Sequence, residues 1–164
     1  MKNRAFTLIE LIMVMVIVSI MAAIAIPRFQ SFYDIKLGGT ARKLVADVRY
    51  AQQLAIINDE AYGVEFNTGA ETYRIYRVSD NSTVIDPLTR GNFIMDYTTD
   101  AEYIGIDLDS VDFAGTSTLM FNAMGVPQDS GGNNIAAEGT VDLSYKGMTR
   151  TITVTPNTGR TILD

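Results

Sequence analysis

The first part of the chain is dominated by one long apolar stretch. Counted from Phe6, it extends over 21 residues and is interrupted only by Thr7, Glu10 and Ser19. A helix of that length is roughly 31 Å long, close to the thickness of the hydrocarbon core of a bilayer. The pattern therefore predicts a single transmembrane helix over residues 6–27.

After Pro27 the pattern becomes that of an amphipathic helix, predicted over residues 28–60. Apolar residues recur at alternating spacings of four and three, which places them on one helix face. They are Leu37, Ala41, Leu44, Val48, Ala51 and Ala55. Polar residues are expected largely on the opposite side, namely Arg42, Lys43, Asp47, Arg49 and Gln52. We expect the apolar face to pack on the protein's own β-sheet.

Beyond residue 60, short β-like runs separated by turn residues replace the helical period. Two hairpins are predicted, from residues 62–66 with 73–78 and from residues 140–145 with 148–155. Weaker strands are predicted over 92–97, 101–106 and 118–122, and loops over 80–90 and 125–137. This order predicts an α+β fold, in which a long N-terminal helix packs on a small antiparallel β head, residues 61–164.

Composition narrows the possible chemistry. The chain has 164 residues, of which 47% are hydrophobic and 20% charged, and these proportions argue against disorder. It has no Cys and no His, which excludes disulfides, zinc–thiolate sites, His-ligated metals and Ser-His-Asp catalysis. Because no nucleophile motif appears either, we expect neither an enzyme nor a cofactor.

Three interpretations of the N-terminus compete. Lys2 and Arg4 precede the apolar run, as in a secretory signal peptide, a plain membrane anchor or a prepilin-type leader. Glu10 argues against the first two, because a carboxylate inside an apolar helix costs a few kcal/mol even on insertion scales. The helical pattern also continues well past the apolar run, which is not expected after a cleaved signal peptide.

The segment Ala5-Phe6-Thr7-Leu8-Ile9-Glu10-Leu11 resembles the class III signal of type IV pilins and type II secretion pseudopilins. The resemblance implies that a prepilin peptidase removes the leader, residues 1–5, by cutting between Ala5 and Phe6. Phe6 would then be N-methylated, and the helix would remain as membrane anchor and filament core. Glu10 would neutralise the N-terminal amine of a neighbouring subunit, and Pro27 lies where the family often has a helix kink. Ala5 replaces the usual Gly, and we still expect cleavage there because Ala is the next smallest residue.

Later segments resemble the H-type minor pseudopilins and the FimT-like minor pilins, namely residues 42–55, 63–67, 121–127 and 152–160. That family's fold has an N-terminal helix packed against two small sheets. The implied function is a minor pseudopilin that initiates or caps the type II secretion pseudopilus. The alternative is a minor pilin of a type IV pilus, acting in pilus assembly or DNA uptake.

The resemblance also implies partners and a location. The partners would be other pilin-like subunits, the prepilin peptidase and an inner-membrane assembly platform. The chain would cross the bacterial inner membrane once, with its N-terminus in the cytoplasm and its head in the periplasm, and then enter a periplasmic or surface filament.

Two features of the head suggest ligands, and both have simpler explanations. Asp107, Asp109 and Asp112 could contribute to a Ca²⁺ site, but their spacing does not match an EF-hand, and a solvated acidic loop is expected instead. Gly159-Arg160 matches one position of the basic motif of DNA-uptake pilins. Residues 61–164 hold six Lys/Arg and fourteen Asp/Glu, so nucleic-acid binding is not expected.

Overall fold

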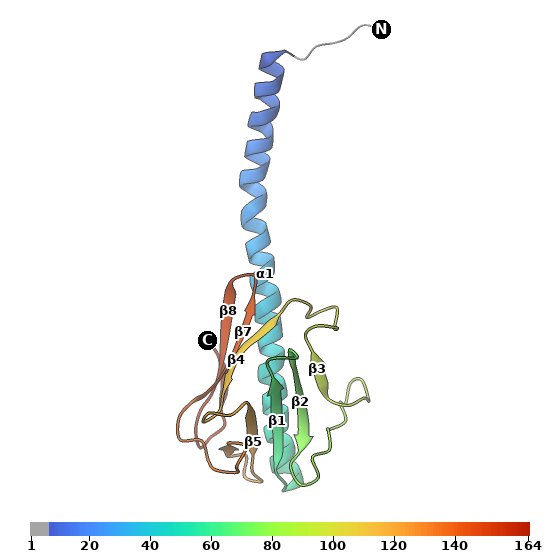
Figure 1. Ribbon diagram of the computed structural model, residues 1–164, viewed down its shortest axis with the longest axis vertical. Helices are drawn as coiled ribbons and strands as arrows, with labels where there is room; N and C mark the ends of the chain where they lie inside the picture. Colours follow the sequence, from blue (N-terminus) through green and yellow to red (C-terminus); the bar gives the residue numbers. More distant parts are fainter. Residues whose placement is uncertain (1–6) are drawn as a thin grey trace. The chain divides into compact units, whose positions relative to one another are not determined.

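The computed structural model describes residues 7–164, with the side chains of residues 25–31 outside the described set. By internal contacts the chain divides into two units, Met1–Ile35 and Lys36–Asp164. One helix, α1 (Leu8–Asn58), contributes to both units, and nine strands follow it in the second (Figure 1). The architecture is the α+β arrangement predicted from the sequence.

The C-terminal end of α1 is capped without glycine. Asp59 adopts a left-handed backbone conformation with φ of 54°, and the amide of Glu60 donates to the carbonyl of Ala55 at 3.3 Å. This six-to-one hydrogen bond is the signature of a Schellman motif, with Asp59 in the position that Gly usually occupies. The helix therefore ends two residues before the predicted boundary.

The predicted apolar face of α1 is confirmed residue by residue. Its members within the second unit are all at most 1% exposed: Leu37, Ala41, Leu44, Val48, Ala51 and Ala55. They form one hydrophobic cluster with the inward-facing residues of the strands. Small residues at three of these positions allow the strands to approach the helix closely.

The strands form two antiparallel sheets. The first has the order β3-β2-β1-β5-β6 and the second β4-β7-β8-β9. The bounds of the first are β1 (Tyr62–Asn67), β2 (Thr72–Arg77), β3 (Ile94–Asp96), β5 (Thr118–Phe121) and β6 (Pro127–Gln128). The bounds of the second are β4 (Asp107–Asp112), β7 (Gly139–Tyr145), β8 (Met148–Val154) and β9 (Thr161–Leu163).

Both predicted hairpins are confirmed, as β1–β2 and β7–β8. In the first, Gly63 lies opposite Tyr76, and a Cβ at Gly63 would approach the Tyr76 ring to 2.7 Å. Glycine at this position therefore lets the tyrosine lie across the neighbouring strand. Phe113 stacks on Phe66 with ring centroids 5.9 Å apart, which joins the region after β4 to the core of the first sheet.

Other predicted elements are corrected. Residues 101–106 form turns rather than a strand, because Asp100 accepts the backbone amides of Tyr103 and Ile104 at 2.9 and 3.0 Å. Strand β4 follows immediately, where an acidic loop was predicted, and β9 was not predicted at all. The short strand β6 lies within the predicted loop 125–137.

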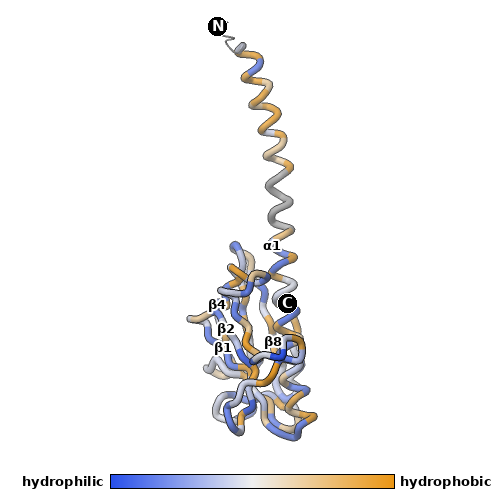
Figure 2. Tube along the Cα trace, turned by 90° about the vertical axis from the view of Figure 1, so that its right-hand side faces the viewer, coloured by the Kyte–Doolittle hydropathy of each residue, from blue (hydrophilic) through white to orange (hydrophobic). Residues whose placement is uncertain are grey.

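Figure 2 colours the chain by hydropathy, and the described part of the apolar stretch is mainly orange. The lower part of α1 and the strands alternate between orange and blue, as expected for elements with one buried face. The helix thus serves two purposes along its length: an apolar segment in the first unit and one layer of a packed core in the second.

Candidate functional site

The start of α1 is organised by Thr7. Its side-chain oxygen accepts the backbone amide of Glu10 at 3.3 Å, and its carbonyl accepts the amides of Glu10 and Leu11 at 3.1 and 3.2 Å. Thr7 therefore acts as the N-cap, and Thr-x-x-Glu has the spacing of a capping box. The same spacing is visible in the sequence, where it signals the start of a helix.

Glu10 lies in the first helical turn and is exposed. The unpaired amides at a helix N-terminus carry partial positive charge, so a carboxylate there is stabilised. The helix itself therefore partly offsets the cost of an acid next to apolar residues. The exposed carboxylate is also available to a cation of another molecule.

The helix around Glu10 exposes large apolar side chains on all sides. Thirteen of them are between 50% and 76% exposed: Leu8, Ile9, Leu11, Ile12, Met13, Val14, Met15, Val16, Ile17, Val18, Ile20, Met21 and Ile24. The hydroxyl of Ser19 donates to the carbonyl of Met15 at 2.8 Å, which satisfies its donor within the helix. A helix that is apolar all round requires apolar surroundings, either lipid or other helices.

Some sequence-based predictions are not tested by this structure. Ala5 and Phe6, the predicted processing site, lie outside the described residues, and so does the side chain of Pro27, the predicted kink. Among the residues that the structure describes, none of the helices reaches the length and apolarity needed to cross a membrane.

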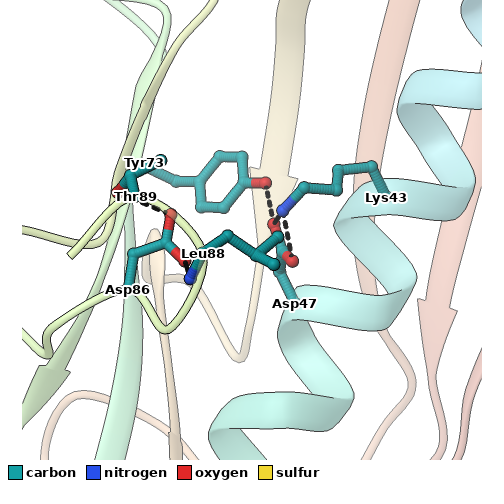
Figure 3. A network of polar contacts seen from close by, with 6 residues as sticks. All are labelled: Lys43, Asp47, Tyr73, Asp86, Leu88 and Thr89. Carbon is teal, nitrogen blue, oxygen red and sulfur yellow. Dashed lines mark hydrogen bonds and ion pairs between the residues drawn. The ribbon is translucent and has the colours of Figure 1, made fainter. Parts of the chain in front are cut away.

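A buried polar network joins α1 to the first sheet (Figure 3). Asp47 is 5% exposed, contrary to its predicted position on the solvent side of α1. Both oxygens of its carboxylate lie 2.6 Å from Nζ of Lys43, and Oδ2 also accepts the hydroxyl of Tyr73 at 2.6 Å. Tyr73 comes from β2 and is itself buried, so the network links helix and sheet through the core.

The loop between β2 and β3 lies beside this network and contacts it through Phe93. Asp86 accepts the amide of Leu88 at 2.8 Å and the hydroxyl of Thr89 at 2.9 Å, which holds the loop in a fixed turn (Figure 3). Lys43 also lies over the ring of Phe93, with its Nζ 5.2 Å from the ring centre. The ammonium group is therefore held between a carboxylate and an aromatic face.

Burial controls the ionisation of this network. Loss of solvation raises the pKa of Asp47 above its ordinary value, although hydrogen bonds from Lys43 and Tyr73 oppose the shift. Burial also raises the pKa of Tyr73, and the nearby phenol of Tyr97 and the carboxylate of Asp47 add to the effect. The carboxylate of Asp47 and the hydroxyl of Tyr73 satisfy each other in the core, so the network stabilises the contact between helix and sheet.

Hydrogen bonds from α1 hold the C-terminal segment, residues 158–161, on the helix. Gln52 donates from Nε2 to the carbonyls of Gly125 and Thr158 at 2.8 and 2.9 Å, and Arg49 donates to the carbonyl of Thr161 at 2.5 Å. Gly159 has φ of 64°, and a Cβ there would lie 2.5 Å from Gln52 Nε2. The glycine of the Gly-Arg pair is therefore explained by packing.

The candidate ligand residues of the head are not gathered into a site. Asp107, Asp109 and Asp112 are exposed on edge strand β4, and within residues 7–164 the described side chains include no group of three acids suited to a metal ion. Arg160 is exposed in the turn before β9. These residues belong to the surface of a sheet and a turn rather than to a pocket.

Comparison with known proteins agrees with these features. Residues 1–26 match the family described as the prokaryotic N-terminal methylation motif. The type IV narrow pilus major component PilA5 of Thermus thermophilus is 33% identical over 93 residues, which cover 52% of this chain and 78% of that protein.

Two solved structures share the fold. The type IV minor pilin FimU of Pseudomonas aeruginosa has a TM-score of 0.55 at 18% identity, over 80% of this chain and 90% of that one. The minor pseudopilin EpsH of Vibrio cholerae has a TM-score of 0.58 at 13% identity, over 81% of this chain and 97% of that one. Family and fold are those of structural subunits and not of enzymes. The chain belongs to the type IV pilin-like family.

Proposed function

We propose that this chain is a membrane-anchored structural subunit of a type IV pilin-like filament. The observation that carries the proposal is the start of α1, where one exposed carboxylate stands among large exposed apolar side chains. Lateral packing of such helices removes the apolar surface from contact with water or lipid, and it needs a cation for Glu10.

The cation in this proposal is the N-terminal amine of Phe6, released when the leader is cut after Ala5. Cleavage by a prepilin peptidase and N-methylation of Phe6 are part of the proposal, and the match to the methylation motif supports them. Before assembly, the subunit would be anchored in the inner membrane with its head in the periplasm. It would then enter the filament through the assembly platform. Mass spectrometry of the membrane-extracted chain should find N-methylated Phe6 as its first residue; a chain that starts at Ile26 would instead indicate an ordinary signal peptide.

Two machines could contain the subunit. The later sequence resemblances favour a minor pseudopilin of the type II secretion pseudopilus, and the likeness to EpsH is compatible with this. The relative from Thermus favours a type IV pilus, because its sequence identity of 33% exceeds the 12–18% of the structural neighbours. DNA uptake has less support, since residues 61–164, which include Arg160, hold six Lys/Arg and fourteen Asp/Glu.

A clean deletion, assayed in parallel for secreted proteins and for surface pili, separates the two. Loss of secretion with normal pili would support the pseudopilus. Loss of pili or twitching with normal secretion would support the pilus. A strain that keeps both at wild-type levels, in the absence of a second copy of the gene, would contradict the proposed function.

A further inference from the structure

The part of α1 that packs in the head has one face that is exposed to solvent. Exposed residues follow each other at helical spacing along it: Gly39, Arg42, Ala46, Arg49, Gln53 and Ile57. Ile57 is 77% exposed. Figure 2 shows this half of the helix at one side of the head, with the strands on the other. The face combines two cations with small and apolar residues, which suits contact with another protein surface.

Charge is divided unevenly within the second unit, residues 36–164. Residues 36–58 contain four Lys/Arg and a single acid, Asp47, which is buried. Residues 59–164 contain six Lys/Arg and sixteen Asp/Glu. Lys43 is paired with Asp47 and Lys36 donates to the carbonyl of Ile104, so the cations of the exposed helix face are Arg42 and Arg49. This face is therefore basic and the strands carry net negative charge, which favours contact between the helix face of one copy and an acidic strand of another.

The most acidic strand is β4. Asp107, Asp109 and Asp112 are exposed there, and none of them forms an ion pair within the described residues. β4 is an edge strand with a register shift between Leu108 and Ser110, and both features discourage another strand from pairing with it. The edge therefore favours contacts through its side chains, and its exposed carboxylates suit a basic surface.

Helix face and acidic edge match in the spacing of their charges. Arg42 and Arg49 are about 10 Å apart along the helix axis, and Asp109 and Asp112 are roughly 8 to 10 Å apart along the strand. β4 is one edge of the second sheet, and β9 is the other, where Arg49 bonds Thr161. We propose that the exposed face of α1 in one copy docks on the β4 edge of a second copy.

This proposal rests on the proposed function and names the neighbour within the filament. Because the two surfaces differ, the contact is head-to-tail and can pass from one copy to the next where copies of this chain are neighbours in the filament. Exposed ion pairs contribute little free energy, so the charges set orientation while the apolar stalks supply most of the affinity.

Cysteine cross-linking tests the contact directly, because the chain has no Cys. The full-length variants Ala46→Cys and Ser110→Cys are produced in three ways: each alone, both in the same cells as a mixture of single variants, and combined in one chain as a double variant. The cells are then treated with a mild oxidant. The mixture should give disulfide dimers, the double variant a ladder of multimers, and each single variant only monomer. Dimers from Ala46→Cys alone would show a symmetric contact between helix faces and overturn the proposal, as would monomers throughout.

Charge reversal gives an independent readout. In the double-cysteine background, Arg42→Glu and Asp109→Lys should each lower the multimer yield about fivefold, and the two together should restore it. Arg90→Glu, an exposed arginine in the β2–β3 loop, is the matched control and should leave the yield unchanged. Filaments of normal yield without these cross-links would overturn this contact but leave the proposed function intact.

Discussion

Asp47 is the residue whose position the hydropathy pattern predicts least well. It lies three residues after Leu44 and directly before Val48, so it borders the buried face of α1. Its burial is tolerable because its carboxylate binds Nζ of Lys43 and accepts the hydroxyl of Tyr73. The partner comes from a strand 26 residues away in the sequence. The i,i+4 spacing of Lys43 and Asp47 was a visible signal for the ion pair, but not for its burial.

Removing this carboxylate should destabilise the head. Asp47→Ala leaves the Tyr73 hydroxyl buried without its acceptor, and we expect a loss of about 2 kcal/mol in the free energy of unfolding. Urea unfolding of residues 30–164 measures the change. Asp107→Ala, which removes an exposed acid, is the control and should change stability by less than about 0.5 kcal/mol. Equal effects of the two variants would contradict the structural role of the network.

The same residue predicts a specific pH dependence. Because the folded state raises the pKa of Asp47, folding favours its protonated form, and this contribution is complete below the ordinary value of 3.8 and is lost as pH rises through the raised pKa. Asp96 acts in the opposite direction, since hydrogen bonds from Thr98 lower its pKa to about 2. Asp96 contributes equally to the stability of the wild-type head and of the Asp47→Asn variant. The difference in stability between the two therefore reports on Asp47. The stability of wild type relative to the variant should fall as pH rises above 3.8, the ordinary pKa of Asp47; a constant difference would contradict the shift.

At the scale of elements, some helices and strands follow from the local sequence pattern, and others depend on pairing with distant strands. The buried face of α1 and the two hairpins follow from residues close in sequence, so periodicity and turn residues are sufficient to predict them. Strand β4 has no clean alternation, because the register shift after Leu108 interrupts it. Strand β9 has three residues, too few for a period, and exists because β8 offers it a partner.

The close packing of the C-terminal segment on α1 gives a prediction at this scale. Gly159→Ala should be more destabilising than Gly132→Ala by about 1–3 kcal/mol. Both glycines have positive φ, so the backbone cost is shared, but an added Cβ meets Gln52 and Phe121 at position 159 and nothing within 4 Å at position 132. Thermal unfolding of the two variants compares them. Similar losses would mean that the segment does not press on Gln52.

At the scale of the whole molecule, the boundary between the two units predicts an independent head. The internal hydrophobic cluster begins at Leu37, so residues 30–164 contain every member of it. This fragment should unfold in one cooperative transition, measured by circular dichroism and by tyrosine fluorescence. Leu44→Ala, which removes a fully buried side chain, should lower its stability by about 2–5 kcal/mol. Transitions that differ between the two probes would argue against a single core.

The sequence by itself determined the long apolar helix, its amphipathic continuation, both hairpins and the family, because each depends on the spacing of neighbouring residues. Tertiary structure alone decided that Asp47 is buried and that Asp107, Asp109 and Asp112 line a strand edge. It also decided that Gly159 is a packing glycine. Those outcomes depend on which distant strand supplies a hydroxyl, a ladder partner or a close contact, and a one-dimensional pattern does not record such pairings.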